Sequence, residues 1–212
     1  MTDVNQRSQR EKRMEGLVKA PSKDELRYVY CLFCQTGRCN IISELLKIRG
    51  IDQAFSPKIV CHERKQGVLY QVTRDLLPGY VFVYDREDLV NTDLLWGIEG
   101  VIRRVGRLEN RFQLEGSDLA FARYLLVKEG VLGVIQLIQE GDQVLTDDPL
   151  FEGHLGRVLR LDARKKRAKI QYEFDGETRC TWIGCNLLYR SGEPVLTERE
   201  TVQKFMKSEL SL

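Results

Sequence analysis

Hydrophobic and polar positions follow two different periods along the chain, and the first region to show them lies near its start. Residues 28–34 are an apolar, aromatic and β-branched run of strand length. Residues 41–48 then place apolar side chains at helical spacing, and Gly50 supplies a stop. Further strand-like runs occupy residues 58–72, with a turn at 65–67, and residues 79–84 and 101–105.

Helical patterns alternate with these strands. Ser117 and Asp118 are suited to cap a helix whose apolar positions include Leu119, Ala122 and Leu125, and residues 85–95 suggest another short helix. Because short connections join the two kinds of element, we predict an α+β fold in which helices flank an antiparallel sheet.

From residue 140 onward the pattern contains only short strands. Ile170, Tyr172 and Phe174 alternate with polar residues, as in a half-buried strand. Asp175 and Gly176 form a strong hairpin signal, and residues 179–183 return as the partner strand. About fifty residues of such hairpins favour a small closed barrel, because closure removes exposed strand edges.

These patterns divide the chain into five parts. We expect a disordered arm at 1–26, an α+β domain at 27–128, a linker at 129–139, a small barrel at 140–190, and a tail at 191–212. The tail places Val202, Phe205, Met206 and Leu210 on one face, which predicts a short amphipathic helix.

Composition narrows the class of protein. The 212 residues are 42% hydrophobic and 30% charged, with a net charge of +2, as in ordinary soluble proteins. No apolar run approaches the ~20 residues of a membrane span. The first 27 residues carry seven Lys or Arg and five Asp or Glu without an apolar core, unlike a secretory signal. We therefore expect a cytoplasmic protein with reduced thiols and no membrane partner.

Positive charge is concentrated in one segment. Residues 157–169 hold seven Lys or Arg against a single acid, Asp162, although residues 140–190 hold nine basic and nine acidic residues. The segment is either a solvated turn or a surface that binds RNA phosphates. Tyr172, Trp182 or Tyr189 would add base stacking if exposed. The candidate RNA-binding residues are Arg157, Arg160, Arg164, Lys165, Lys166, Arg167 and Lys169.

The six cysteines offer a rival hypothesis. Cys31 and Cys34 have the spacing of a zinc knuckle, but inside a strand they point to opposite faces, and no second such pair completes four ligands. We expect buried free thiols and neither metal nor cofactor. His62 and His154 have no evident nucleophile partner, and phosphate-loop and hydrolase motifs are missing from the sequence, so we expect no enzyme activity.

Three ordered motifs resemble a known family. Residues 29–37, 77–83 and 100–106 are similar, in this order, to the N-terminal domain of NusG-type transcription elongation factors. Residues 140–190 resemble the KOW domain that follows it, an SH3-like barrel, so the match spans about residues 28–190. Within the family, the run at 159–170 is most similar to LoaP-type antiterminators, and residues 30–34 resemble the first strand of RfaH.

The resemblance implies that the N-terminal domain binds the clamp helices of RNA polymerase through an apolar patch. Strand periodicity places Tyr80 and Phe82 on one face, but by itself it does not decide between core and exposed partner surface. The resemblance assigns polymerase contacts to Phe33, Leu77, Pro78, Tyr80, Phe82, Asn91 and Thr92. It directs Gln35, Thr36 and Arg38 toward the non-template DNA strand.

The implied function is that of a monomeric, non-enzymatic factor that promotes processive antitermination, with the KOW domain contacting nascent RNA, such as a hairpin. The alternative is a general NusG-like adaptor that bridges RNA polymerase to the ribosome or Rho through an apolar KOW loop around Phe151 and Leu155. Asp93 and Glu99 depart from the RfaH pattern, so we do not expect sequence-specific DNA reading of that kind.

Overall fold

The computed structural model describes residues 22–89, 97–106, 112–140, 143–146 and 157–189. They divide into two compact units, each built from three chain segments, and each unit is treated by itself. Unit 1 takes the described residues of Met1–Ile59, Asp75–Leu132 and Phe174–Glu177, and unit 2 takes those of Val60–Arg74, Gly133–Glu173 and Thr178–Leu212. The predicted arm at 1–26, apart from residues 22–26, and the tail at 191–212 lie outside the described residues.

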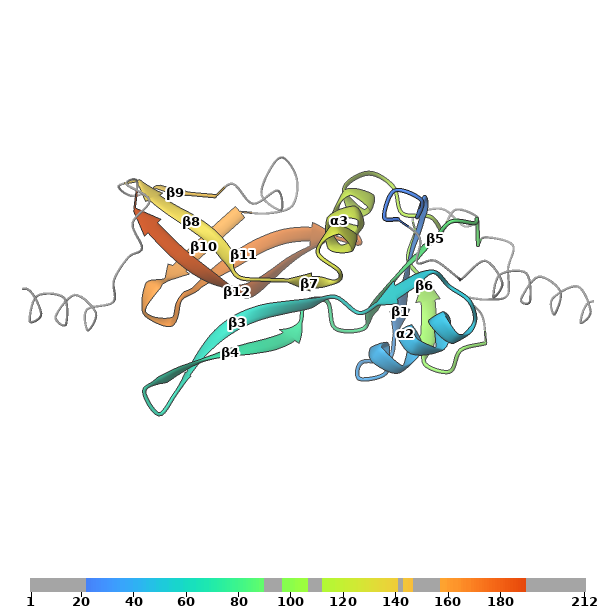
Figure 1. Ribbon diagram of the computed structural model, residues 1–212, viewed down its shortest axis with the longest axis horizontal. Helices are drawn as coiled ribbons and strands as arrows, with labels where there is room; N and C mark the ends of the chain where they lie inside the picture. Colours follow the sequence, from blue (N-terminus) through green and yellow to red (C-terminus); the bar gives the residue numbers. More distant parts are fainter. Residues whose placement is uncertain (1–21, 90–96, 107–111, 141–142, 147–156, 190–212) are drawn as a thin grey trace, which may run out of the picture. The chain divides into compact units, whose positions relative to one another are not determined.

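The elements follow one another as strands with two α-helices interspersed among the first of them (Figure 1). The first part contains β1 (Tyr28–Cys34), α2 (Cys39–Ile48), β2 (Gln53–Phe55), β3 (Lys58–Lys65), β4 (Val68–Asp75), β5 (Tyr80–Asp85), β6 (Val101–Arg104) and α3 (Gly116–Val127). The remainder contains β7 (Val131–Leu132), β8 (Ile135–Glu140), β9 (Gln143–Leu145), β10 (Arg157–Asp162), the 3-10 turn η2 (Ala163–Lys165), β11 (Arg167–Phe174) and β12 (Glu177–Tyr189). The predicted α+β class is confirmed.

Unit 1 is built around a four-stranded sheet in the order β2-β5-β1-β6. One face carries Leu32, Val81 and Val83, which join Ile42 and Leu46 of α2 in a single buried cluster. The opposite face carries residues that contact α3: the Tyr84 hydroxyl donates to the Ala122 carbonyl at 2.8 Å, and Phe82 meets Phe121. The sheet therefore separates two apolar layers, and all six residues of β5 are buried.

Two details of the helices differ from the sequence prediction. The α3 helix begins at Gly116, which has a φ of +58°, and its N-cap is Glu115 rather than Ser117 or Asp118. No helix forms over residues 85–89 of the helix predicted at 85–95, and residues 90–95 are outside the described part. The buried Asp85 carboxylate instead accepts the Glu87 N–H at 2.9 Å, a local turn that competes with a helix.

The sheet of unit 2 has five strands in the order β10-β11-β12-β8-β9. The predicted alternation in β11 is confirmed, because Ala168, Ile170 and Tyr172 are buried while their neighbours are more exposed. Asp175 and Gly176 have φ values of +56° and +73°, which confirms the predicted turn between β11 and β12. Among the described strands the order is open, with β10 and β9 at its ends, so the closed KOW barrel is not confirmed.

The segment 129–139, predicted as a linker, contains strand β7 and most of β8. The β8 strand pairs in parallel with the end of β12, where Cys185 lies opposite Ile135 and Asn186 lies opposite Gln136. Ile135 and Leu137 are buried, so period-two alternation is present in this segment. The predicted linker therefore contributes a strand, β8, to the sheet of unit 2.

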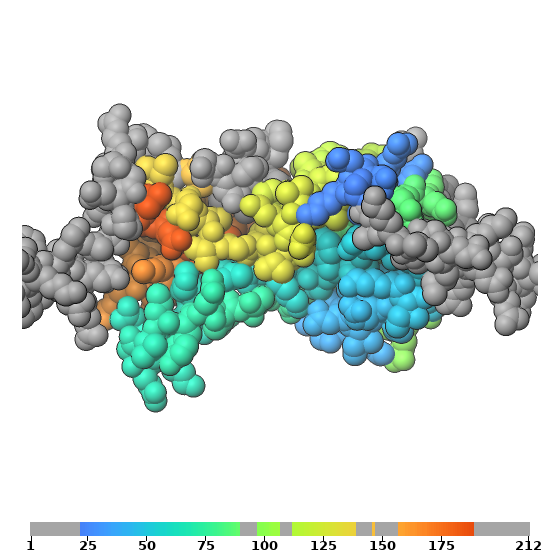
Figure 2. Space-filling model, in the orientation of Figure 1, coloured from blue at the N-terminus to red at the C-terminus, as the bar shows by residue number. Residues whose placement is uncertain are grey.

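The β3–β4 hairpin turns at Gln66 and Gly67, which have φ values of +49° and +82° and match the predicted turn at 65–67. This turn is exposed and lies uncovered, in teal, in the space-filling view (Figure 2).

Neither described α-helix is long and apolar enough to cross a membrane.

Candidate interaction surfaces

The three motifs that carry the family resemblance come together in the sheet of unit 1. They supply β1, β5 and β6, which are neighbours in the order β5-β1-β6. Phe33 of β1 lies opposite Tyr80 of β5 on one side and opposite Arg103 of β6 on the other. Segments separated by up to about seventy residues in sequence thus form one continuous surface.

Three of the predicted polymerase-contact residues share the face of this sheet toward α3. Phe33 and Tyr80 have ring centroids 5.0 Å apart, and Phe82 lies on the same face two residues beyond Tyr80. Phe33 is half-buried, whereas Tyr80 is 4% exposed and Phe82 is fully buried. The rings form one aromatic cluster.

The turn between β11 and β12 belongs to unit 1 and covers this cluster. The Phe174 ring lies 5.4 Å from Tyr80, 5.2 Å from Phe82 and 5.6 Å from Phe121, measured between centroids. Phe174 is itself fully buried. The sequence pattern identified this turn but gave no signal that its aromatic residue packs on residues about ninety positions earlier.

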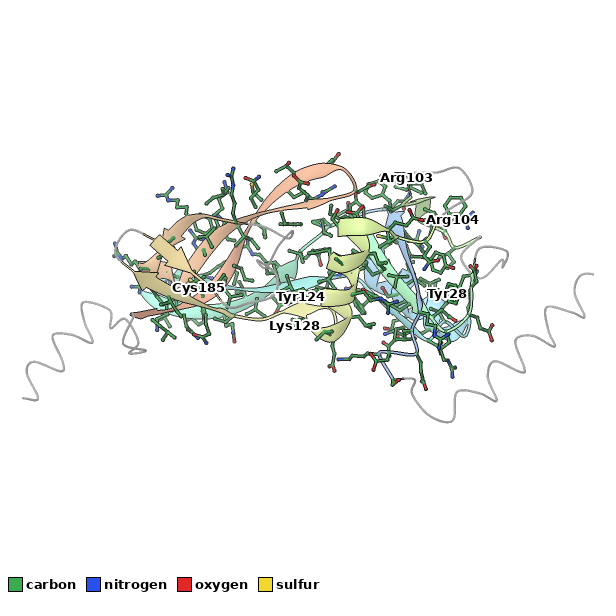
Figure 3. The ribbon with its side chains drawn as sticks, turned by 90° about the horizontal axis from the view of Figure 1, so that it is seen from above. Tyr28, Arg103, Arg104, Tyr124, Lys128 and Cys185 are labelled. Atoms are coloured by element: carbon green, nitrogen blue, oxygen red, sulfur yellow. The ribbon has the colours of Figure 1, made fainter. Side chains whose placement is uncertain are left out.

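Polar and charged residues contact the aromatic cluster. Asp175 accepts a hydrogen bond from the Tyr80 hydroxyl at 3.2 Å and forms an ion pair with Arg103 at 2.6 Å. The guanidinium of Arg103, labelled in Figure 3, also lies over the Phe33 ring at 5.4 Å, and the Asp175 N–H donates to Asp118. The hydrogen bond to Asp175 raises the pKa of Arg103 and keeps it charged. Sequence analysis named Asp118 only as a helix cap and Asp175 only as part of a turn, and it gave Arg103 no separate role.

The remaining predicted polymerase contacts differ in exposure. Leu77 is fully buried, whereas Pro78 is exposed. Gly79 has a φ of +89°, and a Cβ there would lie 3.1 Å from both the Cys34 carbonyl oxygen and the Phe33 ring, so this position requires glycine. Asn91 and Thr92 lie outside the described residues, as does Asp93.

The predicted DNA-facing residues lie just after β1. Gln35 and Thr36 are exposed, and Arg38 is half-buried at the start of α2. Arg38 forms an ion pair with Glu99 at 2.5 Å; this hydrogen bond raises the pKa of Arg38 and lowers that of Glu99. The glutamate that departs from the RfaH pattern therefore offsets the one cation of this group.

The basic segment lies on β10, η2 and β11 of unit 2. Arg160 and Lys169 are directly opposite each other across the β10–β11 pair. Like charges at directly opposed positions repel, so this pair favours an anion between or above them. Arg157 is opposite Gln171 and donates to its side-chain oxygen at 3.4 Å.

The single acid of the segment, Asp162, is used within the turn. Its carboxylate accepts the Lys165 N–H at 3.1 Å and pairs with Arg167 at 3.4 Å. The Arg167 guanidinium also lies over the Trp182 ring at 4.3 Å. Arg160, Arg164, Lys165, Lys166 and Lys169 form no ion pair with any described residue, so their positive charge remains available.

Lys166 occupies a special place in this turn. Its φ of +47° is left-handed, which a lysine adopts only when its surroundings fix it. The Lys166 carbonyl oxygen lies 2.8 Å from His62 Nδ1 and accepts the Cys185 N–H at 2.9 Å. Sequence analysis did not predict that His62, about one hundred residues earlier, anchors the basic turn.

The three aromatic residues proposed to stack on RNA bases differ in burial. Tyr172 is buried, and that burial raises its pKa to about 12, so its ring is not available to a base in this structure. Trp182 is half-buried beneath Arg167, and the side chain of Tyr189 is outside the described part. Trp182 therefore contacts a cation of the basic segment, namely Arg167.

The cysteines do not form a metal centre among the described residues, where no three His, Cys, Asp or Glu side chains come together. Cys31 lies opposite Phe82 on the α3 side of the sheet, whereas Cys34 belongs to the cluster on the α2 side. The prediction that these two thiols point to opposite faces is confirmed.

No family model matches the sequence, and no curated protein matches it. The structure is similar to a solved structure described as "Domain interaction in Thermotoga maritima NusG". The identity is 15% and the TM-score 0.45, over 74% of this chain and 93% of that chain.

Proposed function

We propose that this protein is a NusG-type transcription elongation factor of the specialised, LoaP-like kind. Unit 1 binds the clamp helices of RNA polymerase, and the basic segment of unit 2 contacts nascent RNA and promotes processive antitermination. The protein is not an enzyme in this proposal. The observation that carries it is the assembly of the three family-like motifs into adjacent strands β5, β1 and β6.

The polymerase contact rests on the aromatic cluster of unit 1. Phe33, Tyr80 and Phe82 lie on one face, and large apolar rings of this kind dominate the energetics of protein interfaces. Because Phe174 covers Tyr80 and Phe82, polymerase binding through this face requires the turn at 174–177 to leave it. Contact with non-template DNA through Gln35 and Thr36 is a further part of the proposal.

The RNA contact rests on the uncompensated cations of β10, η2 and β11. Lys and Arg side chains gain affinity for phosphates by releasing counterions, which makes the binding depend on salt and little on sequence. Arg160 and Lys169 are the sharpest positions to test, because they face each other and neither has an acidic partner among the described residues. Arg167 is less informative, because it also supports Asp162 and Trp182.

The test is transcription in vitro on a template with an intrinsic terminator, comparing different RNA leaders with and without the protein. We expect read-through that depends on the leader. The double variant Arg160→Gln/Lys169→Gln removes two cations, so it should bind RNA more weakly and reduce the salt slope of log K by about 1.5. The variant Lys47→Gln/Lys128→Gln changes net charge equally, at exposed positions of unit 1, and should bind RNA as the parent does.

The outcomes separate the two candidate functions. Unchanged RNA affinity and salt slope in Arg160→Gln/Lys169→Gln would refute the RNA contact. Effects on pausing that do not depend on the leader would instead support the general adaptor that bridges polymerase to the ribosome or Rho. Phe151 and Leu155, on which the adaptor hypothesis depends, lie outside the described residues.

A further inference from the structure

A small pocket in unit 2 lies beside the basic turn. Its volume is about 200 Å³, and its apolar walls are formed by Ala163, Cys185, Leu187 and Leu188. Its polar lining consists of Gln136, Lys166 and Asn186. Pockets for drug-sized ligands are usually about 300–1,000 Å³. This one therefore suits a single small group; of its lining residues, Cys185 is labelled in Figure 3.

The two amides of the lining come from neighbouring strands. Gln136 of β8 and Asn186 of β12 lie opposite each other in the parallel pair, and both are exposed. Neither side chain forms a hydrogen bond with another described residue. A side-chain amide presents both a donor and an acceptor, which is what the edge of a nucleobase requires for recognition.

The third polar residue, Lys166, has its backbone held in place by the turn. Two hydrogen bonds to the Lys166 carbonyl, from Cys185 N–H and with His62 Nδ1, fix the left-handed backbone of Lys166. Asp162 holds the other end of the turn by accepting the Lys165 N–H. A backbone that is fixed before binding loses less entropy on binding, so the turn side of the pocket is preorganised.

Lys166 also joins the pocket to the basic surface. It lines the pocket and follows Arg164 and Lys165, and none of these three cations has an acidic partner among the described residues. RNA loops and bulges present unstacked bases whose flanking phosphates lie within one nucleotide. A base in the pocket and phosphates on the cations would therefore come from the same strand.

We propose that this pocket binds one unpaired nucleobase of the RNA, with Gln136 and Asn186 contacting its edge and Lys166 an adjacent phosphate. The inference rests on the proposed RNA contact and assigns to it a substrate class, namely RNA with an unpaired base rather than a continuous duplex. The basic surface supplies affinity, and the pocket supplies the preference for an exposed base.

The test uses the full chain and three probes: a short mixed-sequence single-stranded RNA, the same RNA with abasic riboses, and a duplex of equal length. The parent should bind the single strand about tenfold more tightly than the abasic RNA, because a good contact of a side-chain amide with a base edge is worth ~1–3 kcal/mol. The variant Gln136→Met/Asn186→Leu keeps side-chain size and should lose that preference while its salt slope stays unchanged.

The control Gln71→Met/Asn40→Leu makes the same chemical changes at exposed positions away from the pocket lining and should keep the preference. The inference is wrong if the parent binds single-stranded and abasic RNA equally, or if the pocket variant keeps the preference. Its failure is distinct from that of the RNA contact itself, which is tested by the salt slope of Arg160→Gln/Lys169→Gln. If the parent binds none of the three probes, both proposals are wrong.

Discussion

At the scale of single residues, burial sets the chemistry of the six free thiols. Cys180 is exposed on β12, whereas the other five are buried. Burial raises the pKa of Cys34 and of Cys185 to about 12 in each case, so both stay protonated near pH 8. A protonated, buried thiol is a poor nucleophile.

We therefore predict that Ellman's reagent at pH 8 modifies one thiol rapidly in the native protein and six after denaturation. Fast modification disappears in Cys180→Ser, whose denatured form yields five thiols. Two or more fast thiols in the native parent would contradict the burial of the five cysteines other than Cys180. The same count is unaffected by zinc chelators if the thiols hold no metal.

The aromatic residues show how far single positions were predictable. Alternation along β5 correctly predicted that Tyr80 and Phe82 share a face, because successive strand side chains point in opposite directions. It left open whether that face is exposed, since its cover is Phe174, more than ninety residues away. Long-range packing of this kind leaves no periodic trace in the sequence.

At the scale of elements, the most telling contact joins β3 to β12 within unit 2. Gly184 of β12 lies against the middle of β3, where a Cβ would be 3.0 Å from His62 Nδ1 and 3.2 Å from the Val60 carbonyl oxygen. This close approach lets His62 reach the Lys166 carbonyl and hold the basic turn. The hydrophobic pattern predicted both strands but not their contact, which depends on the missing side chain of one residue.

Gly184→Ala should therefore lower the free energy of unfolding by about 1–3 kcal/mol, as overpacking of a tight contact does. Gly133→Ala is the matched control, because a Cβ there meets nothing within 4 Å, and it should be neutral or stabilising by less than about 1 kcal/mol. Urea denaturation measures both. Equal stability of the two variants would argue against the close approach of β3 to β12.

At the scale of the whole molecule, the two compact units are not consecutive stretches of chain. The sequence predicted domains at 27–128 and 140–190, whereas the units place Val60–Arg74 in unit 2 and Phe174–Glu177 in unit 1. Composition and the positions of turn-forming residues show where a local sequence pattern changes. They therefore predict domains that are continuous stretches of the chain. They carry no information about which hairpin packs with which unit, because that choice depends on long-range apolar contacts such as those of Phe174.

The turn at 174–177 belongs to unit 1, although the residues on either side of it belong to unit 2. We therefore predict that Phe174 controls access to the proposed polymerase-contact face. Phe174→Ala in the full chain removes the ring that covers Tyr80, Phe82 and Phe121. It should destabilise unit 1 by about 3–5 kcal/mol and increase the binding of an apolar dye. Its affinity for a clamp-helix fragment of RNA polymerase, measured by titration calorimetry, should rise.

The variant Phe112→Ala distinguishes uncovering of the α3-side face from a general loss of stability of unit 1. Phe112 is a half-buried ring that packs on the α2-side cluster beneath Arg104, so its removal also weakens unit 1 but leaves the α3-side face covered. We expect lower stability without a gain in affinity for the clamp-helix fragment. Equal affinity gains in both variants would show that loosening alone favours binding, and no gain in Phe174→Ala would place the polymerase contact elsewhere on the molecule.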